Sequence, residues 1–177
     1  MPTQPTDGSV VAVCRKAEPG VPKYPVEAVE LVEDFGIPGD YHAGKFVRHR
    51  YLARLDPTKP NHRHVLITDT TIFADVARRG IDLEPGMMAE NIVVDGVSVM
   101  ALPLGTQIEI GGALVELTEK RDPCGQLNAS HPRLFEVVST GEDGQVCWNA
   151  GMFARILRGG WVRPGDPVVV KSQPEVL

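Results

Sequence analysis

Hydrophobic positions in this chain fall in many short runs, each of strand length and most of them bounded by Gly or Pro. Residues 9–15 form a continuous apolar run, which is typical of a buried strand. Residues 25–33 alternate apolar and acidic side chains, which favours a strand with one face in water, with a helix as the alternative. Residues 107–110 and 113–118 are expected to pair as a hairpin across the two glycines between them.

One segment has a clear helical pattern. Residues 71–80 carry an apolar stripe, Asp69 precedes it as a candidate N-cap, and Gly80 ends it. Residues 127–138 are either a helix or irregular, and further strands are expected at residues 63–68, 92–95, 146–148, 151–157 and 168–170. Strands and helices do not alternate regularly along the chain. The pattern therefore predicts a mainly β protein, a closed or nearly closed β-barrel with one or two packed α-helices.

Composition and charge narrow the class of protein. The 177 residues suffice for one domain, and 42% hydrophobic with 23% charged residues is typical of a globular protein. A net charge of −5 without a Lys/Arg run argues against nucleic acid as a partner. No signal peptide or run of transmembrane length is visible, so no membrane partner is expected. We expect a disordered start at residues 1–8, a single domain at 9–171 and a polar tail at 172–177.

The three cysteines, Cys14, Cys124 and Cys147, lie far apart and form no CxxC motif. This spacing suggests neither a zinc ribbon nor a disulfide framework, and it favours a reducing, cytoplasmic location. Cys14 lies inside an apolar run and is expected in the core.

Cys124 has the strongest chemical signal. Pro123 interrupts the end of a predicted strand, so the next residue is expected to project from a turn. Gly125 allows a close approach of the backbone to a ligand. Arg121 lies three residues earlier, and a nearby cation favours the thiolate, the form that binds metals or attacks sulfur. The alternative is a small buried hydrophobic residue.

Other polar candidates gather in loops. Asp40 and His42 stand in a glycine-rich loop whose backbone could wrap an anion, or they form a simple hydrogen-bonded pair. Asn91 enters a strand, where it either faces a site or satisfies a turn. The basic stretch 45–61 either attracts a phosphate-bearing ligand or is a solvated loop. His62 and His64 are expected on one face of a strand, without a visible third ligand for a metal.

Four pieces together resemble one known family. They are GIPGDYH at residues 36–42, AENI at 89–92, RDPCGQL at 121–127, and GMFARIL at 151–157 with GWVRPGD at 160–166. In this order they resemble the MOSC domain, which is found at the C-terminus of molybdenum-cofactor sulfurases, in its free-standing bacterial form. The resemblance covers roughly residues 9–171, and this chain shows no PLP-dependent domain.

The resemblance implies a β-rich barrel and a set of site residues. Cys124 would be the functional cysteine, which carries sulfur as a persulfide or ligates molybdenum. Arg121, Gly39, Asp40 and Asn91 would belong to the same pocket. The cofactor is an anionic pterin phosphate, so further partners are sensible on electrostatic grounds. These further partners are Arg63, Arg155 and His42.

The chain departs from many free-standing relatives at residues 60–65. Those relatives commonly carry His-Gly-Gly followed by Asp-Arg, whereas this chain has PNHRHV after an Arg-rich insert. Cofactor binding therefore follows less directly from the resemblance than the fold does.

Four functions fit these observations. The first is a molybdenum-cofactor-dependent reductase of N-hydroxylated compounds, in which Cys124 is the metal ligand. The second is a sulfur carrier that cycles through a Cys124 persulfide. The third is a non-catalytic module that presents cofactor or sulfur to a partner enzyme, and the fourth is a barrel with an inert cysteine. The expected ligand is a small-molecule substrate or molybdopterin. The chain has no ferredoxin cysteine cluster and no Rossmann glycine pattern, so if it is a reductase, a separate protein must deliver the electrons. A separate sulfur donor protein is the corresponding partner for the sulfur carrier.

Overall fold

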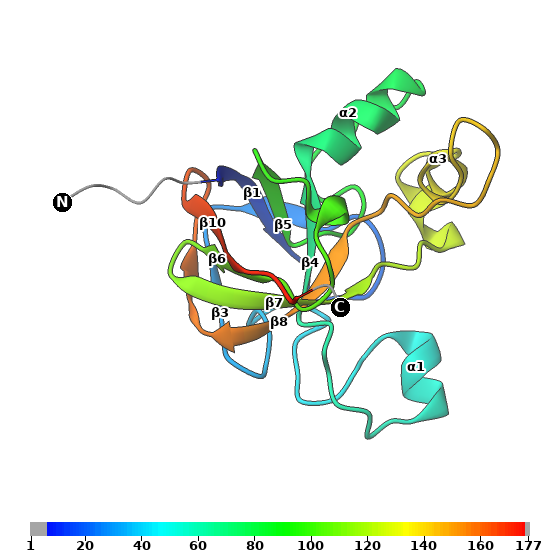
Figure 1. Ribbon diagram of the computed structural model, residues 1–177. Helices are drawn as coiled ribbons and strands as arrows, with labels where there is room; N and C mark the ends of the chain where they lie inside the picture. Colours follow the sequence, from blue (N-terminus) through cyan, green and yellow to red (C-terminus); the bar gives the residue numbers. More distant parts are fainter. Residues whose placement is uncertain (1–6, 176–177) are drawn as a thin grey trace.

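A computed structural model describes residues 7–175 and shows strands that close into a barrel (Figure 1). Around the ring, the strand order is β10-β6-β7-β8-β4-β5-β1, and β1 pairs with β10 to close it. Neighbouring strands are antiparallel except β4 and β5, which are parallel. The predicted closed β-barrel is confirmed. Its strands are β1 (Gly8–Arg15), β4 (Val65–Asp69), β5 (Ile92–Asp95), β6 (Gln107–Ile110), β7 (Ala113–Lys120), β8 (Met152–Arg158) and β10 (Pro167–Ser172).

Alternating side chains fill the barrel. On β7, Ala113, Val115 and Leu117 are buried while the residues between them are half-buried, as expected for a strand with one face on the core. Every residue of β4 is buried, because the helix α2 (Thr70–Arg78) and its neighbours cover that side of the barrel. A second apolar cluster lies between α2 and α3 (Leu134–Ser139). Because both faces of β4 are buried, the ends of this strand are held in place. They support the loops described below.

Several local predictions differ from the structure. Residues 25–33 form two short strands: β2 (Tyr24–Val26) pairs with β1, and β3 (Val29–Leu31) pairs with β9 (Gly160–Val162). The strand predicted at 146–148 is absent, because this apolar stretch lies in an exposed loop where Val146 makes one isolated bridge to Thr140. The predictions of one continuous strand at residues 25–33 and of a strand at residues 146–148 were therefore wrong.

Two α-helices, α2 and α3, pack through buried residues, which confirms the expected one or two packed helices. Residues 7–175 contain one further α-helix. The additional helix, α1 (Arg50–Leu55), lies in the basic stretch and stands away from the barrel (Figure 1). None of its residues is buried, so it has no apolar stripe that a sequence pattern could reveal. Two short 3₁₀ helices, η1 (Val99–Ala101) and η2 (Gly125–Ala129), complete the elements.

The ends of the chain lie partly outside the described residues. The disorder expected at residues 1–8 and the polar tail at 172–177 are therefore not decided for residues 1–6 and 176–177. Within residues 7–175, β1 begins at Gly8 and β10 ends at Ser172. No helix in this range is both long enough and apolar enough to cross a membrane.

Asp69 joins the barrel to α2 as the predicted N-cap. Its Oδ1 atom accepts hydrogen bonds from the backbone N–H groups of Thr71 (2.8 Å) and Ile72 (3.2 Å). Its Oδ2 atom accepts from the N–H of Val99 at 2.8 Å, so one buried carboxylate also holds η1. This side chain therefore satisfies backbone donors from two elements.

Replacing Asp69 with alanine is expected to lower the free energy of unfolding by about 2–4 kcal/mol. The loss combines a missing helix cap with a buried Val99 N–H that has no acceptor. Urea denaturation monitored by circular dichroism measures it. Asp75→Ala, at a half-exposed position of the same helix, should cost no more than about 1 kcal/mol. Equal losses for the two variants would contradict this role.

Candidate functional site

A cavity of about 280 Å³ opens beside the loop that follows β7. It is called the Cys124 cavity below, after one of its lining residues. Its walls come from segments far apart in the sequence, brought together at one end of the barrel. The lining residues are Pro19, Gly20, Val21, Tyr41, His42, His49, Arg50, Tyr51, Arg63, Leu66, Ala89, Asn91, Arg121, Asp122, Cys124, Gln126 and Phe153.

Cys124 lies on the wall of this cavity and is exposed. It follows the end of β7 and is the N-cap residue of η2, so it sits on a turn outside the sheet. A side chain added at Gly125 would meet no atom within 4 Å, so the space next to the cysteine is open. The alternative of a buried, packed cysteine at this position is therefore wrong.

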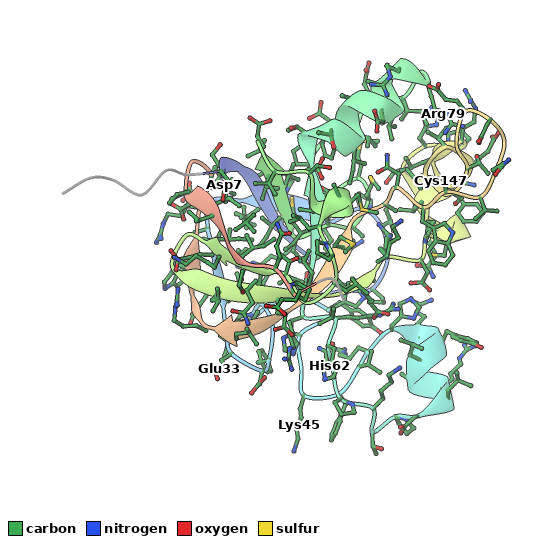
Figure 2. All side chains as sticks on the ribbon, viewed as in Figure 1. Asp7, Glu33, Lys45, His62, Arg79 and Cys147 are labelled. Carbon is green, nitrogen blue, oxygen red and sulfur yellow. The ribbon has the colours of Figure 1, made fainter. Side chains whose placement is uncertain are left out.

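The other two cysteines have different surroundings. Cys14 is fully buried in the core, as expected, and burial raises the pKa of its thiol to about 12, with the Glu90 carboxylate adding to the effect. Cys147 is exposed but lies outside the Cys124 cavity. Figure 2 shows Cys147 near Arg79 at the α2–α3 end of the molecule, away from His62 and Lys45 at the α1 end. Of the three cysteines, Cys124 lines this cavity, and Cys14 and Cys147 do not.

Arg121 lines the cavity, as the sequence predicted, and its side chain is also anchored in the protein interior. Its side chain is buried, and Nη1 donates to the backbone carbonyl of Met88 at 2.6 Å. Burial lowers the pKa of Arg121, while the nearby Glu90 carboxylate acts against that shift. Glu90 is also fully buried, and burial raises its pKa. Arg121 therefore lines the cavity, and the buried Glu90 lies near enough to influence its charge.

Asp40 collects hydrogen bonds from four donors in the polar layer under the cavity. Its Oδ1 accepts from the backbone N–H of Lys16 (3.2 Å) and from Nδ2 of Asn91 (3.1 Å). Its Oδ2 accepts from Nζ of Lys23 (2.9 Å) and the N–H of His42 (3.2 Å). One of these four donors, the N–H of His42, belongs to the glycine-rich loop, and the other three come from segments outside it. Asp40 supports the cavity from below and does not line it.

Gly39 and Asn91 shape the same region. Gly39 has a φ of +85°, a conformation that favours glycine, and it packs beside the side chain of Arg15 without lining the cavity. Asn91 lines the cavity and also holds the framework, because Nδ2 donates to the carbonyl of Cys14 and Oδ1 accepts from the N–H of Leu66, each at 3.1 Å. Asn91 therefore ties β1 to β4 behind the site.

Arg63 forms a cationic wall of the cavity. The side chain is 8% exposed; Nε donates to Glu119, Nη2 donates to Asp122 at 3.2 Å, and the guanidinium stacks on Phe153 at 4.5 Å. Within residues 7–175, its Nη1 is buried and has no hydrogen-bond partner. Buried donors are rarely left unpaired, so this atom is suited to an anionic ligand.

The segment that contains α1 contributes another part of the cavity wall. His49, Arg50 and Tyr51 line the cavity, and within the described residues Nδ1 of His49 is buried without a partner. Residues 45–60 hold five of the chain's 18 Lys and Arg residues but one of its 23 Asp and Glu residues. The basic stretch thus borders the cavity instead of lying apart from it. Sequence reasoning did not assign His49, Arg50 or Tyr51 to the site, although the local charge was the available signal.

Three predicted or considered residues lie elsewhere. Arg155 does not line the cavity, and its Nη2 pairs with Oε1 of Glu116 at 2.9 Å across β7 and β8. His64 is buried, and its Nδ1 accepts from the N–H of Ile156 at 2.9 Å, while burial lowers its pKa to about 4. His62 lines a different, smaller hollow with Thr118. The two histidines precede β4 and do not share a strand face.

Within residues 7–175, no group of three or more His, Cys, Asp or Glu side chains is arranged to hold a metal ion. The unpartnered Nη1 of Arg63 and the exposed thiol suit a group that combines a soft metal with an anionic tail.

The fold resembles several solved structures. YuaD from Bacillus subtilis has a TM-score of 0.76 and 19% identity, with 91% of this chain and 93% of that chain covered. YiiM from Geobacillus stearothermophilus has a TM-score of 0.60 and 21% identity, covering 94% of this chain and 74% of that one. YiiM from Escherichia coli has a TM-score of 0.62 and 18% identity, with 96% and 72% covered. At these identities the likeness shows the fold alone.

No curated protein matches this chain in sequence. The family model of the MOSC domain does match, over residues 39–169, which is well over half of the chain and includes the cavity-lining Cys124. Together with the closed barrel and the thiol at its rim, this match shows that the chain belongs to the MOSC domain family, a family related to the molybdenum cofactor.

Proposed function

We propose that this chain binds a molybdenum cofactor in the Cys124 cavity and uses the Cys124 thiolate as a metal ligand, as part of a reductase. The observation that carries the proposal is the combination of an exposed thiol and the unpartnered Nη1 of Arg63 in one cavity. A thiolate is a ligand type that suits molybdenum, and an arginine is a good partner for a phosphate.

Each side chain has a distinct part in this proposal. Arg63 and His49 would hold the anionic part of the cofactor, since each lines the cavity and has a buried nitrogen without a partner among the described residues. Arg121 would contribute a further positive charge at the cavity wall, and the hydrogen bond between Asn91 and Asp40 would hold the neighbouring framework in place. The bound group would supply redox chemistry toward a small molecule, for which N-hydroxylated compounds are the candidate class. A separate protein would deliver the electrons.

The second candidate is a sulfur carrier, or a non-catalytic module that presents sulfur or cofactor to a partner enzyme. The open space beside Cys124 favours it, because a donor protein needs access to the thiol. The Cys124 thiolate would attack the outer sulfur of a donor persulfide, and the donor cysteine would leave as a thiolate, so no oxidant is required. Either function needs a reduced cysteine, which is why a cytoplasmic location is part of this proposal.

Molybdenum content separates the candidates. We expect molybdenum to co-purify with the wild type and with Cys147→Ser from a cofactor-competent host, and to be lost from Cys124→Ser. Arg63→Gln should retain less metal, because it removes the charged donor for the anionic tail. Elemental analysis and intact-protein mass spectrometry measure the result on the same samples.

Two other outcomes are informative for this test. Protein without molybdenum but with the mass of one added sulfur atom at Cys124 would replace the reductase with the sulfur carrier. Protein with neither metal nor added sulfur, in all variants, would contradict both candidates.

The accessibility of the three thiols gives an independent prediction. In the native protein, iodoacetamide should modify Cys124 and Cys147, which are exposed, and leave Cys14, whose pKa burial raises to about 12. Cys14 should react only after denaturation. Peptide mapping by mass spectrometry identifies the modified residues, and an unreactive Cys124 in native apo protein would contradict the accessible thiol that both functions require.

A further inference from the structure

Lys23 is a buried lysine that the proposed function has not used. It lies in the loop just before β2 and is 2% exposed. Its Nζ is 2.9 Å from Oδ2 of Asp40 and 3.2 Å from Nδ1 of His42. Lysines are almost never fully buried unless they are paired. The contacts with Asp40 and His42 are therefore the interactions that hold Lys23 in this buried position.

Hydrogen-bond chemistry fixes the direction of both contacts. An ammonium group has three donors and no acceptor, and a carboxylate only accepts. Asp40 already accepts from three other N–H groups, as expected for an ionised carboxylate. Burial lowers the pKa of Lys23, while the charge and the hydrogen bond of Asp40 act against that shift and favour the ammonium form. Lys23 therefore donates to Asp40 and to Nδ1 of His42. A ring nitrogen that accepts a hydrogen bond carries no proton.

We propose that Lys23 is a positioning residue that holds neutral His42 in the tautomer with its proton on Nε2. Nδ1 faces the buried ammonium, so the other edge of the ring is the part available to the cavity that His42 lines. His42 then offers the ligand an N–H donor and not a base. This inference deepens the proposed function, because the donor lies in the cavity of Cys124.

The surroundings of His42 keep the ring neutral and oriented. Four ionisable groups act on it, namely Lys23, Asp40, His49 and Arg121, and the ring of Tyr41 packs edge-on at 5.3 Å between centroids. Burial and the Lys23 charge lower the pKa of His42 to about 3, and Asp40 opposes them. The tautomer is therefore expected to persist through the neutral pH range.

This arrangement defines what the cavity recognises. The Nε2–H of His42 and the unpartnered Nη1 of Arg63 are both donors that line one cavity. They fit an oxygen-rich, anionic or strongly polar acceptor and disfavour a cationic ligand. His42 would act by hydrogen bonding to such oxygens and would not remove a proton from a substrate.

Nitrogen NMR on apo protein labelled with ¹⁵N-histidine tests the proposal. Long-range proton–nitrogen correlation spectra distinguish protonated from unprotonated ring nitrogens, and His42→Gln assigns the His42 signals. We expect an unprotonated Nδ1 and a protonated Nε2 from about pH 5 to about pH 8, the range in which an ordinary histidine titrates. His64 provides an internal reference with the same expected tautomer, because its Nδ1 accepts from a backbone N–H.

Two Lys23 variants provide the comparison. Lys23→Arg keeps a cationic donor and should preserve the wild-type pattern, whereas Lys23→Met should give a tautomer mixture or a proton on Nδ1 of His42 alone, with His64 unchanged. If Lys23→Met does not fold, the wild-type spectrum still decides. A proton on Nδ1, or a doubly protonated ring at neutral pH, would overturn the proposal. Since no cofactor is added, this result is independent of the molybdenum measurement.

Discussion

The buried carboxylate of Asp40 is the group on which the candidate site depends. It binds Lys23, Asn91 and two backbone N–H groups, so it connects the loop before β2, the entry to β5 and its own glycine-rich loop. A buried charge without partners is costly, and breaking a buried ion pair by removing one partner typically costs about 3–5 kcal/mol. The loops around the cavity are therefore held by a network whose members depend on one another.

The barrel supplies the rigid frame for this network. Closure through β1 and β10 leaves the strand ends fixed, and Cys124 lies four residues after Lys120, the last residue of β7. The cavity walls differ in support: Arg63 is buried and stacked on Phe153, while α1 contributes its wall from a helix without buried residues. The ligand-facing surface thus combines a rigid side, which holds the thiol and Arg63, with a basic side that has fewer contacts to the core.

The sequence predicted the parts of the molecule that depend on local patterns. The run at β1, the hairpin of β6 and β7, the stripe and cap of α2, and the exposed turn at Cys124 each follow from neighbouring residues. Barrel closure followed from many short strands without helical crossovers. Helix α1 could not be predicted, because a short exposed helix leaves no hydrophobic period.

Long-range pairs explain the remaining differences at the site. Lys23 gave no signal, since its partners Asp40 and His42 are separated from it by 17 and 19 residues. Arg155 was assigned to the site on charge alone, but strand pairing places it beside Glu116. Conversely, His49, Arg50 and Tyr51 are cavity residues because the start of the α1 segment reaches the cavity wall. The topology of the chain decides which charged residues come into contact. The pattern of charges along the sequence does not contain that information.

The proposed ligation of a cofactor metal by Cys124 can be measured at the metal itself. The measurement is X-ray absorption at the molybdenum edge, on wild type and Cys124→Ser reconstituted with isolated cofactor. We expect the wild-type metal to have one sulfur neighbour more than the variant, with an oxygen or nitrogen in its place in the variant. Identical metal environments in the two proteins would contradict it.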